Sequence, residues 1–209
     1  ASGTTGAWFL KAPGGARAWA LGGVSAAAGR GADAVFLSPA SVSRFEPESP
    51  SELAFGYDAL IETAYSGSAA YARPLGRDGA LAAGLLYASQ GAQTSYDRNG
   101  DATGNFTPFD LALGVWYARR LGSVALAGGV KLIHSTLAER SGTTGAADFG
   151  VQARHVADIG EGPLDLGLSL QHLGPPLKLG AVADPLPARV PGAGARAGPL
   201  LPARAGCGA

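Results

Sequence analysis

The sequence predicts an all-β fold, an antiparallel up-and-down transmembrane β-barrel of about eight strands that follows a glycine-rich, plug-like N-terminal segment. Three observations support this prediction. Apolar residues alternate with small or polar ones along most of the chain after residue 51, which is typical of strands. Several of these strands run for about 11 residues, whereas globular strands usually have about 5 or 6 and a tilted membrane strand needs about 9–11. The small, mildly polar face suits a barrel lumen better than a surface in water.

The composition excludes several classes of protein. Lys and Arg number 16 and Asp and Glu number 16 among 209 residues, so the net charge is zero and no nucleic-acid partner is expected. A hydrophobic content of 46% is too high for a disordered chain. The single cysteine, Cys207, excludes an internal disulfide and a thiolate metal cluster. No stretch resembles an apolar transmembrane helix of about 20 residues.

Residues 1–50 form the first of three predicted segments, the plug-like one. Short apolar runs at 7–10 and 16–21 are broken by glycine and show neither a helical nor a strand period. The chain begins with small residues and contains no methionine. This pattern predicts an exported protein whose signal peptide has been removed, with a fragment of a longer sequence as the alternative.

The second segment, residues 51–200, contains the barrel strands, and residues 201–209 form an irregular tail. The alternation is cleanest where Leu166, Leu168 and Leu170 are separated by small or polar residues. Strands are expected at 52–62, 65–75, 80–95, 109–119, 123–138, 145–157 and 163–173. An eighth, near 186–197, is interrupted by Pro187 and Pro191.

The connections predict a meander in which short turns alternate with longer loops. Glycine-containing turns are expected at 76–79, 119–123 and 160–163, and longer polar loops at 96–108 and 139–145. Aromatic residues near strand ends are expected to form the girdles of a membrane barrel. They are Tyr65, Tyr71, Tyr87, Tyr96, Trp116 and Tyr117. A soluble β-sandwich with aromatics in its core is the alternative.

Charged residues on predicted inner faces, and one in the plug-like segment, are candidates for lining the lumen. They are Arg17, Asp58, Glu62, Asp148, Arg154 and Asp165. Such groups either tune the selectivity of a barrel or merely hydrate its interior.

The loop residues Asp97, Asn99 and Asp101 have the spacing of a calcium loop. The places of its glycine and its bidentate glutamate are occupied by Ala102 and Pro108. We therefore expect an exposed loop and no metal site.

Catalysis and cofactors are not expected. His134, His155 and His172 fall on predicted strands, but no nucleophile, base and orienting group recur at a recognisable spacing, and no G-x-S-x-G turn is present. The glycine pairs near residues 14 and 22 do not follow the order of a phosphate-binding loop.

Four segments carry a family resemblance: residues 7–23 (AWFLKAPGGARAWALGG), 37–42 (LSPASV), 97–121, and 170–178 (LQHLGPPLK). In this order they resemble the PorV/PorQ-type outer-membrane proteins, relatives of the FadL-like long-chain fatty-acid transporters. The chain departs from the family at Ser38, Ser41 and His172, where the family has Asn, Gly and Asn. It also lacks the final aromatic residue common in outer-membrane barrels, which predicts a truncated or divergent C-terminus.

The resemblance implies a non-catalytic protein of the bacterial outer membrane that serves transport or protein secretion. Its expected partners are membrane lipid and either a secreted or surface-attached protein or a hydrophobic small molecule. Family barrels have more strands and longer chains, which leaves barrel closure open. The alternatives are a barrel that anchors a surface partner through the loops at 97–108 and 139–145, a soluble β-sandwich binding module, and an outer-membrane hydrolase.

Overall fold

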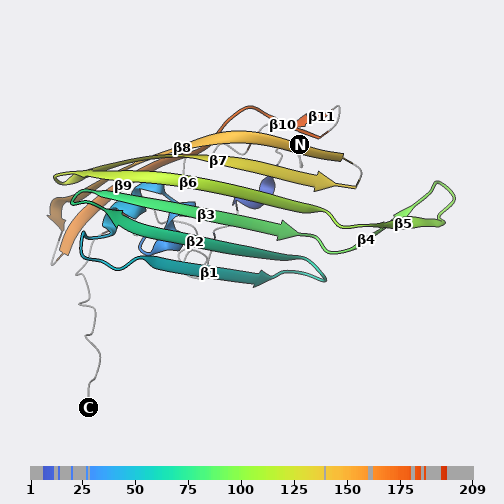
Figure 1. The fold of residues 1–209 in the computed structure, drawn as a ribbon, viewed down its shortest axis with the longest axis horizontal. Coiled ribbons are helices and arrows are strands. Elements are labelled where there is room, and N and C mark those ends of the chain that lie inside the picture. Colours follow the sequence, from blue (N-terminus) through green and yellow to red (C-terminus); the bar gives the residue numbers. More distant parts are fainter. Residues whose placement is uncertain are drawn as a thin grey trace, which may run out of the picture.

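A computed structural model describes residues 7–11, 14, 20, 27, 29–138, 140–159, 162–179, 182–184, 186 and 194–196. Its main feature is one antiparallel sheet, strongly curled into a half-barrel (Figure 1). In spatial order its strands are β1 (Glu52–Ala59), β2 (Tyr65–Leu75), β3 (Gly79–Ser89), β6 (Phe109–Leu121), β7 (Val124–Leu137), β8 (Arg140–Ile159), β9 (Gly162–Leu173) and the short β12 (Gly194–Arg196). The predicted all-β meander is confirmed.

Two smaller hairpins are not hydrogen-bonded into this sheet. The first consists of β4 (Gln93–Tyr96) and β5 (Ala102–Phe106), and it projects well beyond the end of the sheet (Figure 1). The second pairs β10 (Leu177–Leu179) with β11 (Val182–Asp184). None of the described helices is long and apolar enough to cross a membrane.

The prediction of a closed barrel is wrong for the part of the chain that the structure describes. There β1 pairs only with β2 and β12 pairs only with β9, so the two edges of the sheet do not meet. An eight-stranded barrel closes around side chains alone. Here the concave face also packs against a whole backbone segment, residues 29–46.

Two of the predicted connections are also wrong. The supposed loop at 139–145 belongs mostly to β8, which begins at Arg140 and pairs with β7 from there onward. Its threonines are polar but β-branched, and such residues favour strands. The predicted strand 80–95 instead ends at Ser89, shortly before Gly91 adopts φ 73°. The predicted loop at 96–108 includes β5 and the turn of the projecting hairpin.

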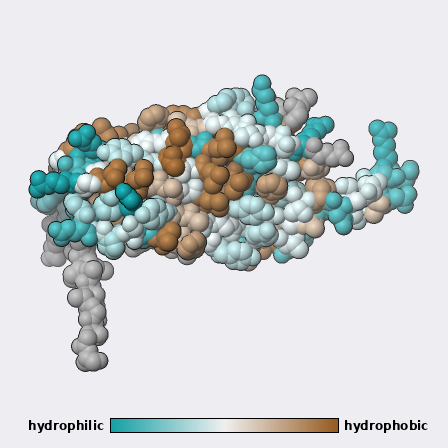
Figure 2. Space-filling view, viewed as in Figure 1, coloured by the Kyte–Doolittle hydropathy of each residue, from teal (hydrophilic) through white to brown (hydrophobic). Residues whose placement is uncertain are grey.

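The convex face of the sheet is apolar and exposed. Phe55 and Tyr57 on β1 are 78% and 72% exposed. The same face continues across the sheet through Leu81, Leu113, Val115, Tyr117, Leu126, Val130, Leu132, Phe149, Val151, Leu166 and Leu168, all exposed. Figure 2 shows hydrophobic residues over the middle of the molecule and hydrophilic ones towards its two ends.

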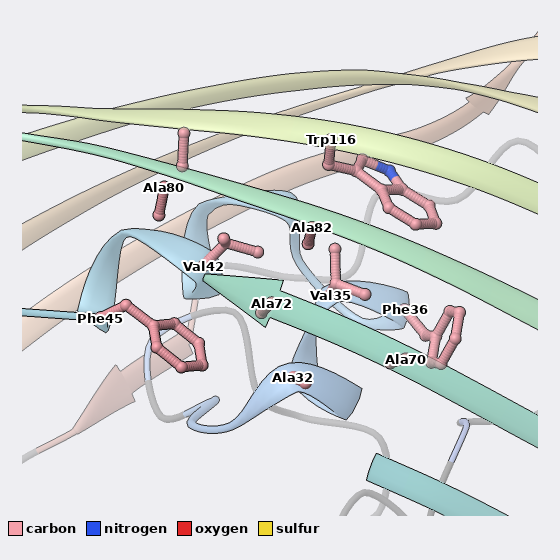
Figure 3. Packing of buried hydrophobic residues seen from close by; sticks show 11 residues of the cluster. Ala32, Val35, Phe36, Val42, Phe45, Ala70, Ala72, Ala80, Ala82 and Trp116 are labelled. Carbon is pink, nitrogen blue, oxygen red and sulfur yellow. The ribbon is translucent and has the colours of Figure 1, made fainter. Parts of the chain in front are cut away.

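The core lies on the concave face, where residues 29–46, called the inner segment below, pack against the sheet. This segment includes two 3-10 helices, η2 (Ala32–Phe36) and η3 (Pro39–Arg44); a third, η1 (Trp8–Lys11), precedes it. Val35, Phe36 and Val42 meet a floor made mostly of alanines (Figure 3). That floor consists of Ala70, Ala72, Ala80, Ala82, Ala118 and one large residue, Trp116.

The small residues of the concave face are what allow this close packing. A Cβ atom on Gly84 would lie 2.7 Å from the Phe36 ring, and one on Gly150 would lie 2.9 Å from the Ala40 backbone nitrogen. Phe36 in turn packs edge-on against Trp116, with ring centroids 6.1 Å apart. The small face predicted from the sequence therefore accommodates a packed segment of the chain.

Candidate functional site

Four buried residues from four neighbouring strands form a polar group on the concave face, called the central cluster below: Trp116 (β6), Lys131 (β7), Asp148 (β8) and His172 (β9). Asp148 Oδ2 lies 2.7 Å from Lys131 Nζ and accepts a hydrogen bond from Trp116 Nε1 at 2.9 Å. Asp148 Oδ1 accepts one from the His172 backbone N–H at 2.8 Å. Three donors thus compensate one buried carboxylate.

A local irregularity of the sheet creates this geometry. The register of β8 with β9 shifts between Ala147 and Phe149, and His172 adopts a left-handed φ of 61°. A β-bulge of this kind redirects side chains, and here it lets the Asp148 carboxylate reach the His172 backbone. Lys131 Nζ lies 2.7 Å from His172 Nδ1. Because an ammonium group only donates, Nδ1 is the acceptor in this contact when Lys131 is charged.

A second charged group, called the arginine cluster below, lies where the inner segment ends. It comprises Arg44 and Glu46 of the inner segment, Arg120 of β6, Arg154 of β8 and Asp165 of β9. Arg44 Nη2 donates to Asp165 Oδ2 at 2.9 Å, and Arg120 Nη1 lies 3.0 Å from both carboxylate oxygens of Glu46. Arg154 Nη1 is 3.8 Å from Glu46 Oε1, beyond a normal hydrogen bond.

The arginine cluster therefore carries three guanidinium groups and two carboxylates. Arg44 is deeply buried, with a side chain 9% exposed. Its Nη2 also donates to the Ala27 carbonyl, while its Nε has no hydrogen-bond partner among the described residues. The two ion pairs of this cluster that are shorter than 3.5 Å, Arg44–Asp165 and Arg120–Glu46, both join the inner segment to the sheet.

Besides the ion pairs, polar contacts to the inner segment and to the residue Ala27 come from both edges of the half-barrel. Gln171 Nε2 donates to the Phe36 carbonyl at 3.2 Å, and Gln152 Nε2 donates to the Ala27 carbonyl, which precedes the segment, at 3.1 Å. On the opposite edge, Glu52 Oε1 accepts from the Ala32 backbone N–H at 3.0 Å. The inner segment is thus held by apolar packing on β2, β3 and β6 and by polar contacts from β1, β6 and β9.

The residues predicted to line a lumen fall in different places. Asp148 belongs to the central cluster, and Arg154 and Asp165 belong to the arginine cluster. Asp58 points inward from β1 and accepts a hydrogen bond from Ser66 Oγ at 3.3 Å. Glu62 was expected on an inner face, but it lies exposed in the β1–β2 turn because β1 ends at Ala59.

The remaining predicted residues lie elsewhere. Arg17 is outside the described residues. Asp97, Asn99 and Asp101 lie in the exposed turn between β4 and β5, where Asp97 Oδ1 accepts from the backbone N–H groups of Asn99 at 2.8 Å and Asp101 at 2.9 Å. In the part of the chain described, no group of three His, Cys, Asp or Glu side chains is placed to hold a metal.

Several cluster residues were not predicted, although some had a signal. Trp116 was assigned to an aromatic girdle, yet it shares its face of β6 with Ala112, Gly114 and Ala118 and is buried on the concave side. The same alternation also turns Arg120 inward. Arg44 had no such signal, because its position depends on the packing of an irregular segment.

The convex face carries an aromatic ladder across five neighbouring strands. Tyr57, Tyr65, Tyr87, Phe109 and His134 follow one another with successive ring centroids 6.1, 5.8, 6.1 and 5.8 Å apart. Tyr65 and Tyr87 were predicted girdle residues, and the other three were not.

The three histidines occupy separate environments. His134 belongs to the aromatic ladder, His172 is buried in the central cluster, and His155 is exposed and lies 2.9 Å from Asp158.

No protein-family model matches the chain, and no curated protein matches its sequence.

Proposed function

We propose that this chain is a membrane-embedded β-sheet protein of the bacterial outer membrane, active in transport or secretion and without catalytic activity. The observation that carries the proposal is the exposed apolar convex face. The concave face already packs against the inner segment, so a sheet dissolved in water would need a polar convex face. An apolar surface of this extent requires lipid or a protein partner to cover it.

The dimensions of the apolar band favour lipid. On β7 it extends from Val124 to Leu132, which at about 3.4 Å per residue is about 27 Å along the strand. A strand tilt of about 40° reduces this to about 21 Å across the membrane, close to the ~25 Å band of outer-membrane barrels.

The residues at the two ends of the apolar band also support strands that cross a membrane. At one end the aromatic ladder runs across the strands, as aromatic residues do at the boundary between lipid and water. At the other end, charged residues gather in the β2–β3 turn, including Arg77 and Asp78, while Arg119 of β6 is exposed beside Leu126 near that end of the band. The family resemblance described above agrees with this reading, since outer-membrane strands alternate between lipid-facing and inward-facing residues.

Within this proposal the inner segment acts as a plug. It occupies the concave face, which is the side that would enclose a passage in a membrane barrel. Among the described residues, the outer edges of β1 and β12 are unpaired, and this imposes a further requirement because exposed backbone N–H and C=O groups are costly in lipid. Further strands, from this or another chain, must then continue the sheet.

A second candidate function is attachment of a surface partner through the β4–β5 hairpin. The hairpin projects beyond the sheet, and its turn presents exposed polar groups at Asp97, Asn99 and Asp101 (Figure 1). The predicted contribution of residues 139–145 to such a surface is withdrawn, since these residues lie in or next to β8.

Fractionation tests the main proposal. The chain, exported with a cleavable signal peptide, is expected in the outer-membrane pellet, resistant to alkaline carbonate and released only by detergent. Release into the aqueous phase without detergent would refute it. Deleting residues 93–106 separates the two candidate functions: loss of partner capture with unchanged solute permeation favours attachment, and the reverse favours transport.

A further inference from the structure

We propose that the arginine cluster binds a small oxyanion, a carboxylate or a phosphate, which competes with Glu46 and Asp165 for the guanidinium groups. A role of this site in opening a passage rests on the proposed function in transport, whereas the binding of the oxyanion does not. The site would make the passage responsive to its own anionic solute.

The charge balance of the cluster favours an anion. Three guanidinium groups face two carboxylates, and the charged groups acting on Arg154 are Arg44, Arg120, Glu46 and Asp165. Among the described residues, one positive charge of the cluster is therefore uncompensated. Arginine side chains are always charged and present planar donor pairs that match carboxylate and phosphate oxygens.

Hydrogen-bond donors are also available there. Arg44 Nε is buried without a partner among the described residues, in a side chain more than nine-tenths buried. Among those residues the nearest acidic partner of Arg154 is Glu46 Oε1, 3.8 Å from Nη1, so the guanidinium group retains donors for a ligand. A buried donor without an acceptor is costly, and an oxyanion beside Arg44 and Arg154 would remove that cost.

Competition follows from how the cluster connects the two parts of the fold. Arg44 and Glu46 belong to the inner segment, and each pairs with a group of opposite charge on the sheet, Asp165 and Arg120. An anion bound by Arg44, Arg120 and Arg154 would take donors from these two ion pairs. Binding would therefore loosen the end of the inner segment while leaving its apolar packing on β2 and β3 in place.

Calorimetry of the full chain in detergent tests the binding. Inorganic phosphate is titrated at neutral pH, with ionic strength held constant by sodium chloride. We expect saturable binding, weakened about tenfold by Arg154→Gln and unchanged by Arg119→Gln, which removes an exposed arginine from the opposite face of β6. Absence of saturable binding, or equal affinity in Arg154→Gln and the wild type, would overturn the proposal.

Two further variants keep the test decisive if Arg154→Gln does not fold. Arg154→Lys keeps the charge but loses the planar donor pair, and it is expected to bind more weakly than the wild type. Glu46→Gln removes a competing carboxylate and is expected to bind phosphate more tightly. Weaker or unchanged binding in Glu46→Gln would contradict the competition, since loss of a merely structural ion pair gives no gain in affinity.

Hydrogen exchange and a lipid control complete the experiment. Saturating phosphate is expected to accelerate amide exchange at residues 41–46 in the wild type and not in Arg154→Gln; unchanged exchange in both would overturn the loosening. A short-chain phosphatidylglycerol, used below its critical micelle concentration, tests whether the ligand is a lipid headgroup. Binding of this lipid without binding of phosphate would contradict the proposal that the ligand is a soluble oxyanion. Because these measurements are made in detergent, their failure is distinguishable from a failure of membrane fractionation.

Discussion

Lys131 Nζ and Asp148 Oδ2, on the neighbouring strands β7 and β8, lie 2.7 Å apart in the buried interior of the half-barrel. The two side chains are 6% and 0% exposed. Burying one charge alone is far more costly than burying a matched pair that also has hydrogen-bond partners. Trp116 Nε1 and the His172 backbone N–H supply those partners, so the pair joins four strands through one carboxylate.

Asp148→Asn is expected to destabilise the protein by about 3–5 kcal/mol, because it leaves the Lys131 ammonium group buried without its counter-charge. The free energy of unfolding in detergent, from urea titration, measures this. The double variant Lys131→Met/Asp148→Asn is expected to recover part of the loss, since it removes the unpaired charge. A single variant as stable as the wild type would show that the pair contributes nothing.

The glycine at position 150 is expected to tolerate no side chain. In Gly150→Ala the new Cβ would lie 2.9 Å from the Ala40 backbone nitrogen, and overpacking of this kind costs about 1–3 kcal/mol. Gly128→Ala is the matched control on the neighbouring strand, because its Cβ would meet only ordinary contacts, the nearest at 3.7 Å. Thermal unfolding of both variants should separate them, and equal melting temperatures would mean that the inner segment is not seated against β8.

Charge placed on the convex face is expected to oppose membrane insertion in a depth-dependent way. Val130→Arg, two residues inside the Leu132 end of the apolar band, should cost more stability in lipid vesicles than Leu121→Arg at the end of β6, within a range of about 0–4 kcal/mol for such charges. Urea titration of the vesicle-inserted protein compares them. If the convex face lay in water, replacing either exposed residue would be nearly neutral, and the two variants would not differ.

Much of the sheet could be predicted from the sequence because its two faces differ so strongly. Large apolar residues stand at every second position, and a period of two is typical of strands, whereas helices repeat every 3.6 residues. Residues 139–145 were wrongly predicted to form a loop because they are polar. Threonine nevertheless favours strands, and Thr143 and Thr144 pair with β7. Trp116 was misplaced because its residue type was given more weight than its register, which already put it on the small face.

The candidate sites were less predictable because they depend on contacts between distant parts of the chain. Asp148, Arg154 and Asp165 could be chosen from strand periodicity alone. Arg44, the partner of Asp165, lies 121 residues away from it in sequence, in a segment without periodicity. Likewise, the packing of the inner segment on the concave alanines and glycines is not encoded in the strand patterns.

The exposed β4–β5 turn provides a pH-dependent prediction outside the apolar band. The backbone N–H groups of Asp101 and Asn99 donate to the Asp97 carboxylate and hold its pKa below the usual value. Because the pKa is lower in the folded turn, the carboxylate stabilises the turn fully above the ordinary Asp pKa of about 3.9. This contribution is lost as the pH falls through the lowered folded value, where protonation weakens both hydrogen bonds.

NMR titration of the Asp97 side chain and of the Asn99 and Asp101 amides measures this effect. The three signals are expected to titrate together with one midpoint below the ordinary Asp pKa. Asp97→Asn keeps the shape but removes the charge, so the two amide shifts should become independent of pH over the same range. A midpoint at or above the ordinary value would mean that the two backbone hydrogen bonds do not persist in solution.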